Sequence, residues 1–254
     1  MAALSRRQEA LIKSLSQRHG RRNSELCLCE GLRCCQEALT LRPDLVELIA
    51  LREDFNGFLP KVQLEPCVLP EREFDALCET VTAQGVLAVL KKPEPPAQSS
   101  ALLDPYAFVL DRVSDPGNFG TILRTARASG LKELWYAKGS TDPYSGKCIR
   151  SASSSQFALN LRQFESLPEL AETLSGLGIV HFFRTTPSGG APLYSEEKLF
   201  DKSAIIMGGE AFGARLLETA KDISIPMPGG AESLNVAQAS TIILFEHVRR
   251  SACA

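Results

Sequence analysis

Five short apolar runs rich in β-forming residues alternate with helical patterns from residue 106 onward. This alternation constrains the fold more than any other feature, because strands separated by helices form a mostly parallel sheet with helices on both faces. Such sheets bind ligands at the carboxyl ends of their strands, so the chemistry is expected in the segments that follow the strands. The runs cover residues 106–110, 133–137, 178–183, 204–207 and 222–225, and the helical patterns lie at about 118–129, 166–175, 213–220 and 234–250.

A proline-rich stretch divides the 254-residue chain. Residues 91–104 contain Pro93, Pro95 and Pro96, followed by a polar run without apolar periodicity, which is typical of a semi-rigid linker. The preceding segment alternates helix and strand signals and predicts a small α/β domain. We therefore expect a first domain over residues 1–92, a linker over 93–103 and a second domain over 104–254. The predicted elements of the first domain are helices over 4–18, 31–40 and 71–82 and strands over 24–29, 45–51 and 85–90.

The composition excludes several classes of protein. The formal net charge of −2 predicts no general affinity for polyanions, and no apolar run is long enough to span a membrane. The N-terminus lacks the apolar core of a secretory signal. The eight cysteines form no CxxC pair and the three histidines are scattered. We therefore expect buried, reduced thiols, no metal site and a cytoplasmic protein.

The first 22 residues are locally basic, with six Lys and Arg residues against a single acid. Two interpretations are equally open. The charges form an ordinary solvated helix face, or they form a surface that contacts phosphates. In the second interpretation Arg18, Arg21 and Arg22 are candidates for nucleic-acid contact.

Residues 111–130 follow the first strand of the second domain. Asn118 comes directly after a Pro-Gly turn and is suited to cap the next helix, which by itself would explain its presence. A cap does not explain Gly120, because glycine in a helix costs about 1 kcal/mol relative to alanine. Gly120 therefore indicates close approach to the backbone. Arg124 and Arg127 on the same helix indicate an anionic or hydroxyl-bearing ligand.

Two further glycine-rich loops follow the fourth and fifth strands. Residues 207–213 place Glu210 among three glycines, and residues 225–236 lead through a Pro/Gly loop to Ser233 and Asn235, either of which could cap the last helix. None of the three loops carries a lysine for phosphate binding, and the P-loop pattern is absent. The loops therefore favour an uncharged or zwitterionic cofactor over a polyphosphate.

Together these motifs resemble the SpoU family of RNA ribose 2′-O-methyltransferases, within the SPOUT superfamily. The resemblance covers about residues 104–250. It rests on Asn118-Phe-Gly-Thr-Ile-Leu-Arg124, on Gly208-Gly-Glu210, and on Ile225-Pro-Met followed by Ser233-Leu-Asn-Val236. The segment Leu28-Cys-Glu-Gly31, followed by a helix, resembles the ribosomal-protein-like (L30e-like) substrate-binding domain of many members.

The resemblance implies an α/β fold with a C-terminal trefoil knot, S-adenosylmethionine as cofactor, RNA as substrate and a homodimer. Ribosomal RNA is favoured over transfer RNA by the N-terminal domain. The matching positions imply a catalytic group of Asn118, Arg124, Glu210, Ser233 and Asn235, and cofactor contacts from Gly208, Gly209, Ile225, Met227 and Leu234. Residues expected to contact RNA are Arg18, Arg21, Arg22, Arg127 and Arg150.

Several points stay open at this stage. Arg124 either loses its proton through burial among cations or stays charged and stabilises the developing alkoxide. Ala152 and Ser154 occupy positions where the family often has Ser and Gly, which puts substrate details in question. A catalytically inactive RNA-binding protein on the same scaffold is the main alternative. A nucleotide-phosphate enzyme is disfavoured because GxGxxG and a P-loop lysine are absent.

Overall fold

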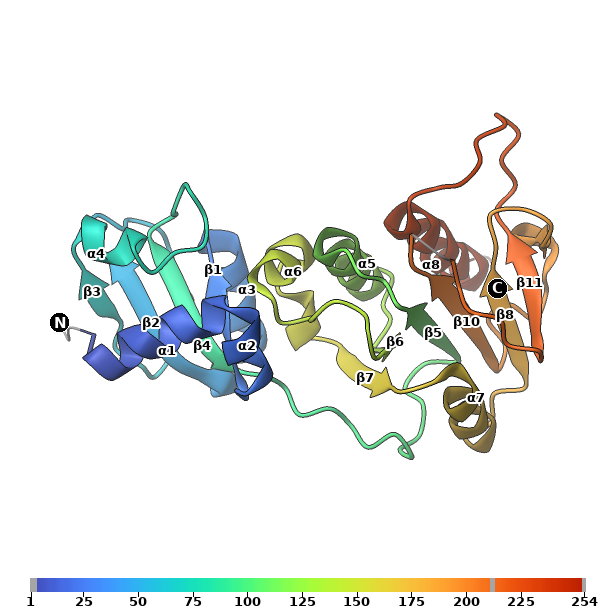
Figure 1. Ribbon diagram of the computed structural model, residues 1–254, viewed down its shortest axis with the longest axis horizontal. Coiled ribbons are helices and arrows are strands. Elements are labelled where there is room, and N and C mark those ends of the chain that lie inside the picture. The colour runs from blue at the N-terminus through green and yellow to red at the C-terminus, as the bar shows by residue number, and fades with distance from the viewer. Residues whose placement is uncertain (1–3, 211–212, 253–254) are drawn as a thin grey trace. The chain divides into compact units, whose positions relative to one another are not determined.

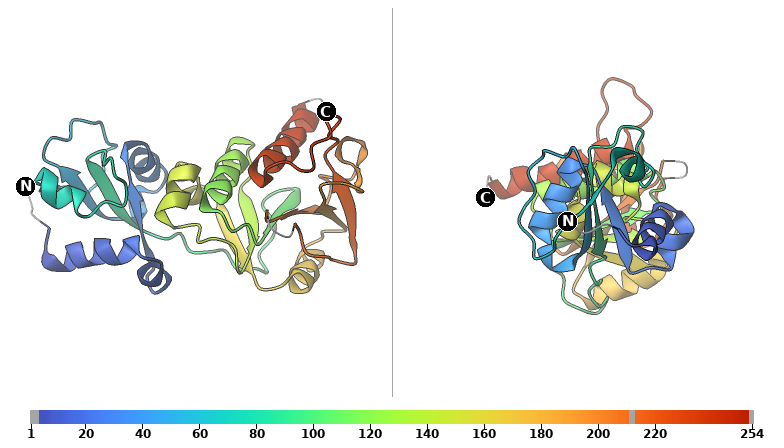
Figure 2. Two further views of the ribbon diagram at one scale, coloured as in Figure 1. Left: turned by 45° about the horizontal axis from the view of Figure 1, so that its top comes forward. Right: turned by 90° about the vertical axis from the view of Figure 1, so that its left-hand side faces the viewer.

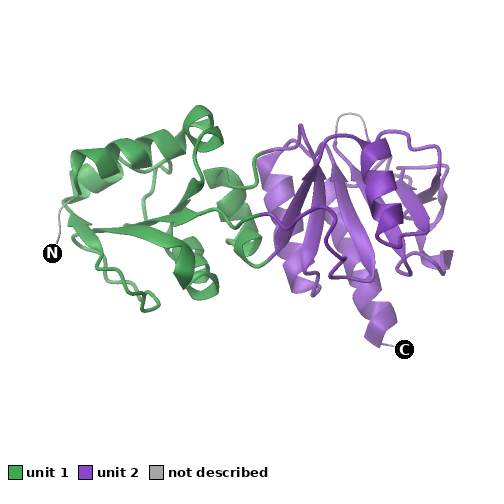
Figure 3. Ribbon diagram, turned by 90° about the horizontal axis from the view of Figure 1, so that it is seen from below, with its two compact units in different colours: residues 1–94, 142–158 green, residues 95–141, 159–254 purple. Residues whose placement is uncertain are grey.

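The computed structural model describes residues 4–210 and 213–252. It divides into two compact units (Figure 3). Unit 1 comprises residues 1–94 and 142–158, and unit 2 comprises residues 95–141 and 159–254. The division differs from the predicted one, because residues 142–158 belong with the N-terminal segment. The physical reason is apolar burial, since Ile149 and Phe157 enter the same core as Cys34 and Cys35.

Unit 1 is a four-stranded mixed sheet between two helical layers. The strand order is β1-β4-β2-β3, in which β4 is antiparallel to both neighbours and β3 is parallel to β2. The apolar residues of α1 and α4 pack on one face, and those of α3 and α6 on the other. The elements are α1 (Arg6–Ser16), α2 (Arg18–Arg22), β1 (Leu26–Glu30), α3 (Leu32–Leu41), η1 (Pro43–Leu45), β2 (Val46–Arg52), β3 (Cys67–Leu69), α4 (Glu71–Asp75), β4 (Val86–Lys91), α6 (Gly146–Ala152) and η2 (Ser155–Phe157).

Unit 2 is a seven-stranded sheet in which every described strand pair is parallel (Figure 1). The strand order is β7-β6-β5-β10-β8-β11-β9, so the chain reverses its direction of winding between β5 and β10. The elements are β5 (Tyr106–Asp111), α5 (Pro116–Ala128), β6 (Glu133–Ala137), β7 (Asn160–Phe164), α7 (Leu167–Gly176), β8 (His181–Thr185), β9 (Ala191–Pro192), η3 (Leu193–Ser195), β10 (Ser203–Gly208), β11 (Ala220–Ser224) and α8 (Val236–Ala252).

Helices cover both faces of the unit 2 sheet (Figure 2). Leu170 and Leu174 of α7 pack against Ala107 and Val109 of β5. Because side chains alternate along a strand, the neighbouring residues of β5 point to the opposite face, where α5 packs against α8. The prediction of a mostly parallel α/β sheet is confirmed.

Several local features differ from the predictions. Residues 213–220 form no helix, because Gly213 has a φ of +65° and Arg215 is drawn into a tertiary ion pair. Asp115 rather than Asn118 caps α5, and its carboxylate accepts a hydrogen bond from the Asn118 N–H at 2.8 Å. Strand β7 and helix α6 had no recognised signal, since both are short and polar at several positions.

The predicted linker is bound to unit 2 along part of its length. The guanidinium of Arg162 donates to the backbone carbonyls of Ala97, Ser100 and Ala101 at 2.8–3.1 Å. Arg162 is itself buried and paired with Glu133 at 2.7 Å. Residues 97–101 therefore follow a defined path on the sheet.

Candidate functional site: a glycine-lined cavity beside an amide–carboxylate network

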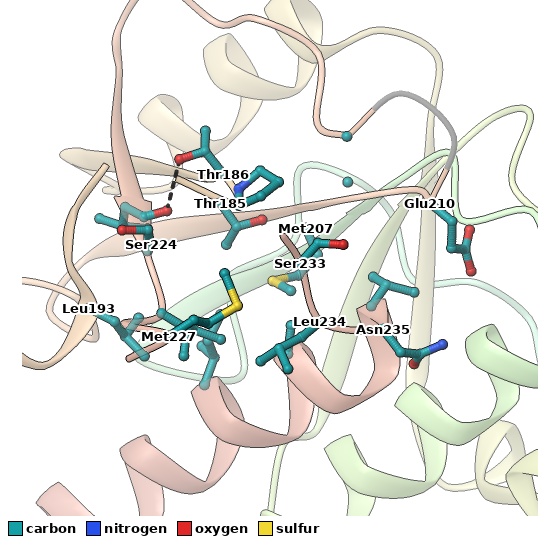
Figure 4. Close-up of a pocket in the computed structure, with 18 of the residues that line it drawn as sticks. Thr185, Thr186, Leu193, Met207, Glu210, Ser224, Met227, Ser233, Leu234 and Asn235 are labelled. Atoms are coloured by element: carbon teal, nitrogen blue, oxygen red, sulfur yellow. Dashed lines mark hydrogen bonds between the residues drawn. The ribbon is translucent and has the colours of Figure 1, made fainter. Parts of the chain in front are cut away.

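A cavity of about 290 Å³ lies at the carboxyl ends of β8, β10 and β11 (Figure 4). Figure 4 shows Glu210 and Asn235 on one side of this cavity and Thr186 and Leu193 on the opposite side. Every predicted cofactor-contacting residue lines it, together with three predicted catalytic residues: Gly208, Gly209, Ile225, Met227 and Leu234, with Glu210, Ser233 and Asn235.

Two glycines allow the chain to pass tightly at the cavity wall. A Cβ atom on Gly208 would overlap the backbone of Gly213 and Ala214, and one on Gly209 would overlap the carbonyl of Arg112. Backbone atoms cannot move aside as a flexible side chain can. Only glycine therefore fits both positions without displacing the loop that carries Glu210.

Three side chains from the three sequence motifs form one hydrogen-bonded chain. The amide nitrogen of Asn118 donates to the carboxylate of Glu210, and the amide nitrogen of Asn235 donates to the Asn118 side-chain oxygen at 3.1 Å. Asn235 also caps α8, because its side-chain oxygen accepts from the N–H of Ala237 at 2.9 Å. The network therefore joins the starts of α5 and α8 to the β10 loop.

Arg124 lies on the exposed face of α5, one turn and a half beyond Asn118. Within residues 4–210 and 213–252 it has no hydrogen bond or ion pair. Its guanidinium is therefore available to a bound molecule. The role of Arg124 stays a prediction; in this chain by itself the side chain is exposed.

Several cavity residues were missed by the sequence analysis. Thr185 ends β8, Thr186 and Pro187 follow it, and Ser224 ends β11. Their position at the carboxyl end of a parallel strand is the sequence signal that indicates them, because ligands bind where such strands end. No lysine or arginine occurs among the described lining residues, and Glu210 is the charged one.

The residues predicted to contact RNA are placed unequally. Arg18 and Arg22 are exposed, but Arg21 is buried and bound to Asp142 at 3.0 Å and to two backbone carbonyls. Its guanidinium holds residues 142–158 to the N-terminal segment and does not suit the predicted RNA contact. Arg150 is likewise engaged, with Glu79 at 3.4 Å. Arg127 is half-buried on α5.

Ala152 and Ser154, the two departures from the family pattern, lie in the segment 142–158 that packs into unit 1. Ala152 ends α6 and is buried. Ser153 and Ser154 both have left-handed backbone conformations, with φ of +48° and +59°, which explains why glycine is favoured at position 154. The buried Ser154 hydroxyl donates to the Cys34 carbonyl at 2.9 Å and offsets part of this strain.

The remaining sequence expectations concern thiols, metals and membranes. Cysteines 27, 29, 34, 35, 67, 78 and 148 are free, and burial raises the pKa of the Cys27 thiol to about 12. In the described part of the chain, no group of His, Cys, Asp and Glu side chains could hold a metal ion. No described helix is both long and apolar enough to cross a bilayer.

The fold and the cavity define a class. This is an α/β protein whose parallel sheet has, at its carboxyl edge, a cavity with glycine-lined walls and one carboxylate, and that edge is where such sheets bind ligands.

Comparison with known proteins identifies the family. The model of the SpoU rRNA methylase family matches residues 105–245. The 23S rRNA (guanosine(2553)-2′-O)-methyltransferase RlmP of Bacillus subtilis is 34% identical over 243 residues, which cover 93% of this chain and 94% of the relative. The chain belongs to the SpoU rRNA methylase family, as its three motifs indicated.

Solved structures resemble the whole chain. A structure from Porphyromonas gingivalis assigned to the TrmH family of RNA methyltransferases has a TM-score of 0.83 at 26% identity, covering 98% of this chain and 100% of the other. The SpoU methyltransferase AviRb from Streptomyces viridochromogenes, in complex with AdoMet, has a TM-score of 0.81 at 24% identity and covers 98% and 100%. The similarity therefore extends over both units.

Proposed function

We propose that this protein transfers a methyl group from S-adenosylmethionine to a ribose 2′-hydroxyl of RNA, with ribosomal RNA as the substrate. One observation carries the proposal: the chain of hydrogen bonds from Glu210 through Asn118 to Asn235 joins all three motifs beside the cavity. The names of the family and of its Bacillus relative support ribosomal RNA over transfer RNA.

The cavity fits S-adenosylmethionine in size and chemistry. Apolar side chains such as Ile225, Met227 and Leu234 suit the adenine ring, and the glycine backbone at 208–209 allows close contact. A carboxylate without neighbouring lysine or arginine in the described lining suits a cationic group and not a polyphosphate. The cofactor supplies an electrophilic methyl group on a sulfonium.

The protein side chains divide the remaining work. Arg124 presents a charged guanidinium that would donate to the ribose 2′-oxygen and stabilise its negative charge as the 2′-hydroxyl proton passes to solvent. The methyl group would then pass from the sulfonium to that oxygen, leaving the cofactor as a neutral thioether. Asn118 and Asn235 orient Glu210 and the substrate at the start of α5. Ser233, exposed at the cavity, contacts the substrate ribose or phosphate.

The finer features of the family belong to the same proposal. We expect a C-terminal trefoil knot, which two tight passages of the chain support: a Cβ atom on Gly190 would lie 2.6 Å from the backbone of Ile223, and one on Gly208 would overlap the backbone of Ala214. We also expect a homodimer. Unit 1 acts as the RNA-binding domain, and exposed Arg18 and Arg22 contact phosphates.

Calorimetry and a methylation assay test this function. The wild-type protein should bind S-adenosylmethionine but neither NAD nor ATP, and should label ribosomal RNA from cells that lack the gene. Asn118→Ala should lower kcat about 10–100-fold by misplacing the reacting groups, whereas Asn56→Ala, an exposed asparagine of unit 1, should leave it unchanged. Failure to bind S-adenosylmethionine would overturn the proposal.

A second variant tests the role of Arg124. If Arg124 acts by its charge alone, Arg124→Lys should retain part of the activity without a new pH dependence. A near-wild-type rate that rises with pH through the lysine pKa would mean instead that the side chain removes the proton.

A further inference from the structure

Asp111, the last residue of β5, contacts both ends of the segment that carries Glu210. At the start of that segment, the Gly209 N–H donates to the Asp111 carbonyl at 3.0 Å. At its end, the Arg215 N–H donates to the Asp111 carboxylate at 2.8 Å. Asp111 therefore fixes the backbone at Gly209 and at Arg215, on either side of Glu210 and Gly213 in the sequence.

The Arg215 side chain strengthens the second contact. Its guanidinium meets the Asp111 carboxylate through two nitrogens, at 2.6 and 2.9 Å. The Asp111 side chain is 0% exposed, whereas that of Arg215 is one-third exposed. A buried carboxylate depends on its partners, because desolvation without compensation is costly. The guanidinium of Arg112, 3.7 Å away, is the other cation near this carboxylate among the described residues.

The surrounding backbone leaves little room at Gly208 and Gly209. Gly208 pairs in register with Asp111; a Cβ atom on Gly208 would overlap the backbone of Gly213 and Ala214, and one on Gly209 would overlap the carbonyl of Arg112. Moreover, the loop residue Gly213 donates its N–H to the Gly209 carbonyl at 2.9 Å. A shift at the Arg215 end is therefore transmitted to the cavity wall at 208–209 and to Glu210.

We propose that Asp111 and Arg215 are positioning residues, which hold the Glu210 carboxylate and the backbone at 208–209 in the geometry that binds the cofactor. Neither residue lines the cavity, so they act through the backbone contacts of Gly209, Gly213 and Arg215. This inference rests on the proposed function, because it concerns the same cofactor site.

Arg215→Gln tests the inference by removing the guanidinium while keeping the backbone contact. We expect the Kd for S-adenosylmethionine to rise about tenfold and kcat to fall, with RNA affinity unchanged. Amide hydrogen exchange at Gly209, Gly213 and Arg215 should become faster, while exchange in the strands of unit 2 stays slow. Arg215→Lys, which keeps the charge but not the paired nitrogens, should lie between wild type and Arg215→Gln.

Two additional variants separate positioning from general stability. Asp111→Asn combined with Arg215→Gln leaves no unpaired buried charge, so the melting temperature should recover relative to the single variant while cofactor affinity stays low. Arg42→Gln removes an arginine that pairs with Asp44 through two nitrogens at 2.7 and 2.9 Å in unit 1, and should leave cofactor affinity unchanged.

The outcomes distinguish this inference from the proposed function. If the wild type binds S-adenosylmethionine and Arg215→Gln binds it equally well, the positioning role is wrong and the proposed function stands. If cofactor affinity falls only in parallel with the melting temperature and recovers in the double variant, the pair is merely structural. If the wild type binds no S-adenosylmethionine, the proposed function fails, and unchanged exchange at Gly209 and Gly213 in Arg215→Gln would independently refute the loop contact.

Discussion

Replacing Arg162 by methionine should destabilise unit 2 and release the linker. Arg162 and Glu133 are both 1% exposed, and their side chains are joined at 2.7 and 2.9 Å. Removing one partner of a buried pair leaves an uncompensated charge, at a cost of about 3–5 kcal/mol. The methionine side chain fills much of the space of the arginine side chain. The cost therefore arises mainly from the unpaired carboxylate of Glu133 and from the lost hydrogen bonds to the linker carbonyls.

The double variant Glu133→Met, Arg162→Met supplies the matched control. It leaves no buried charge unpaired. Its loss of stability should therefore come only from the missing hydrogen bonds to the linker and to Leu103, at about 1 kcal/mol each. Because linker carbonyls can bind water when released, part of that loss is recovered. The double variant should therefore be more stable than Arg162→Met by about 2 kcal/mol.

Fluorescence provides a local assay. Trp135 is the chain's single tryptophan, is fully buried, and has the Arg162 guanidinium 5.0 Å from its ring centroid. Urea unfolding followed through Trp135 therefore measures the stability of the unit that contains the pair, and hydrogen exchange over residues 97–101 measures release of the linker. A loss below 1 kcal/mol in Arg162→Met, or a double variant less stable than the single one, would refute the reasoning.

Three other predictions follow from the described contacts. Hydrogen bonds from Arg249 and Arg250 lower the pKa of Glu246 to about 2. These interactions therefore stabilise the fold above pH 4.5, and the stabilisation is lost as the pH falls toward 2. Glu246→Gln should lower the free energy of unfolding at pH 7 by on the order of 1–2 kcal/mol, and urea unfolding of this variant should depend less on pH between 4.5 and 2. Gly208→Ala should abolish S-adenosylmethionine binding in calorimetry through backbone overlap, while Gly176→Ala, where a Cβ meets nothing within 4 Å, should not. Arg22→Gln should reduce the salt dependence of RNA affinity by about one phosphate contact. Arg21→Gln should mainly lower the melting temperature, because Arg21 is buried. A smaller salt dependence in Arg21→Gln than in Arg22→Gln would contradict the RNA contact proposed for Arg22.

The sequence by itself determined the parallel architecture and the loops that line the cavity. Strands such as 106–111 and 133–137 are apolar runs whose periodicity is local, so they were predicted within a residue or two of their observed ends. Glu210, Ser233 and Asn235 were predicted to belong to one site because each follows a strand of the same parallel sheet. Asn235 even fulfils its predicted local role as a helix cap.

Only the tertiary structure decided which polar groups pair across long sequence separations. The sequence suits Asn118 to a helix cap, but Asp115 takes that role and leaves the Asn118 side chain to reach Glu210 and Asn235. The local charge makes Arg21 a candidate for RNA contact, but its side chain is buried against Asp142. In each case a charged or amide side chain has several equivalent local uses, and the choice among them depends on partners brought close by the fold.

The same reason explains the misplaced elements. Residues 142–158 lie in sequence between β6 and β7 of unit 2 but bury Ile149 and Phe157 in unit 1. Residues 213–220 have a helical pattern but form no helix, and Arg215 binds Asp111 instead. Periodicity records which residues are apolar, whereas burial against a distant segment decides where they pack. Local propensities amount to tenths of a kcal/mol per residue, and the tertiary burial and ion pairing that oppose them are larger.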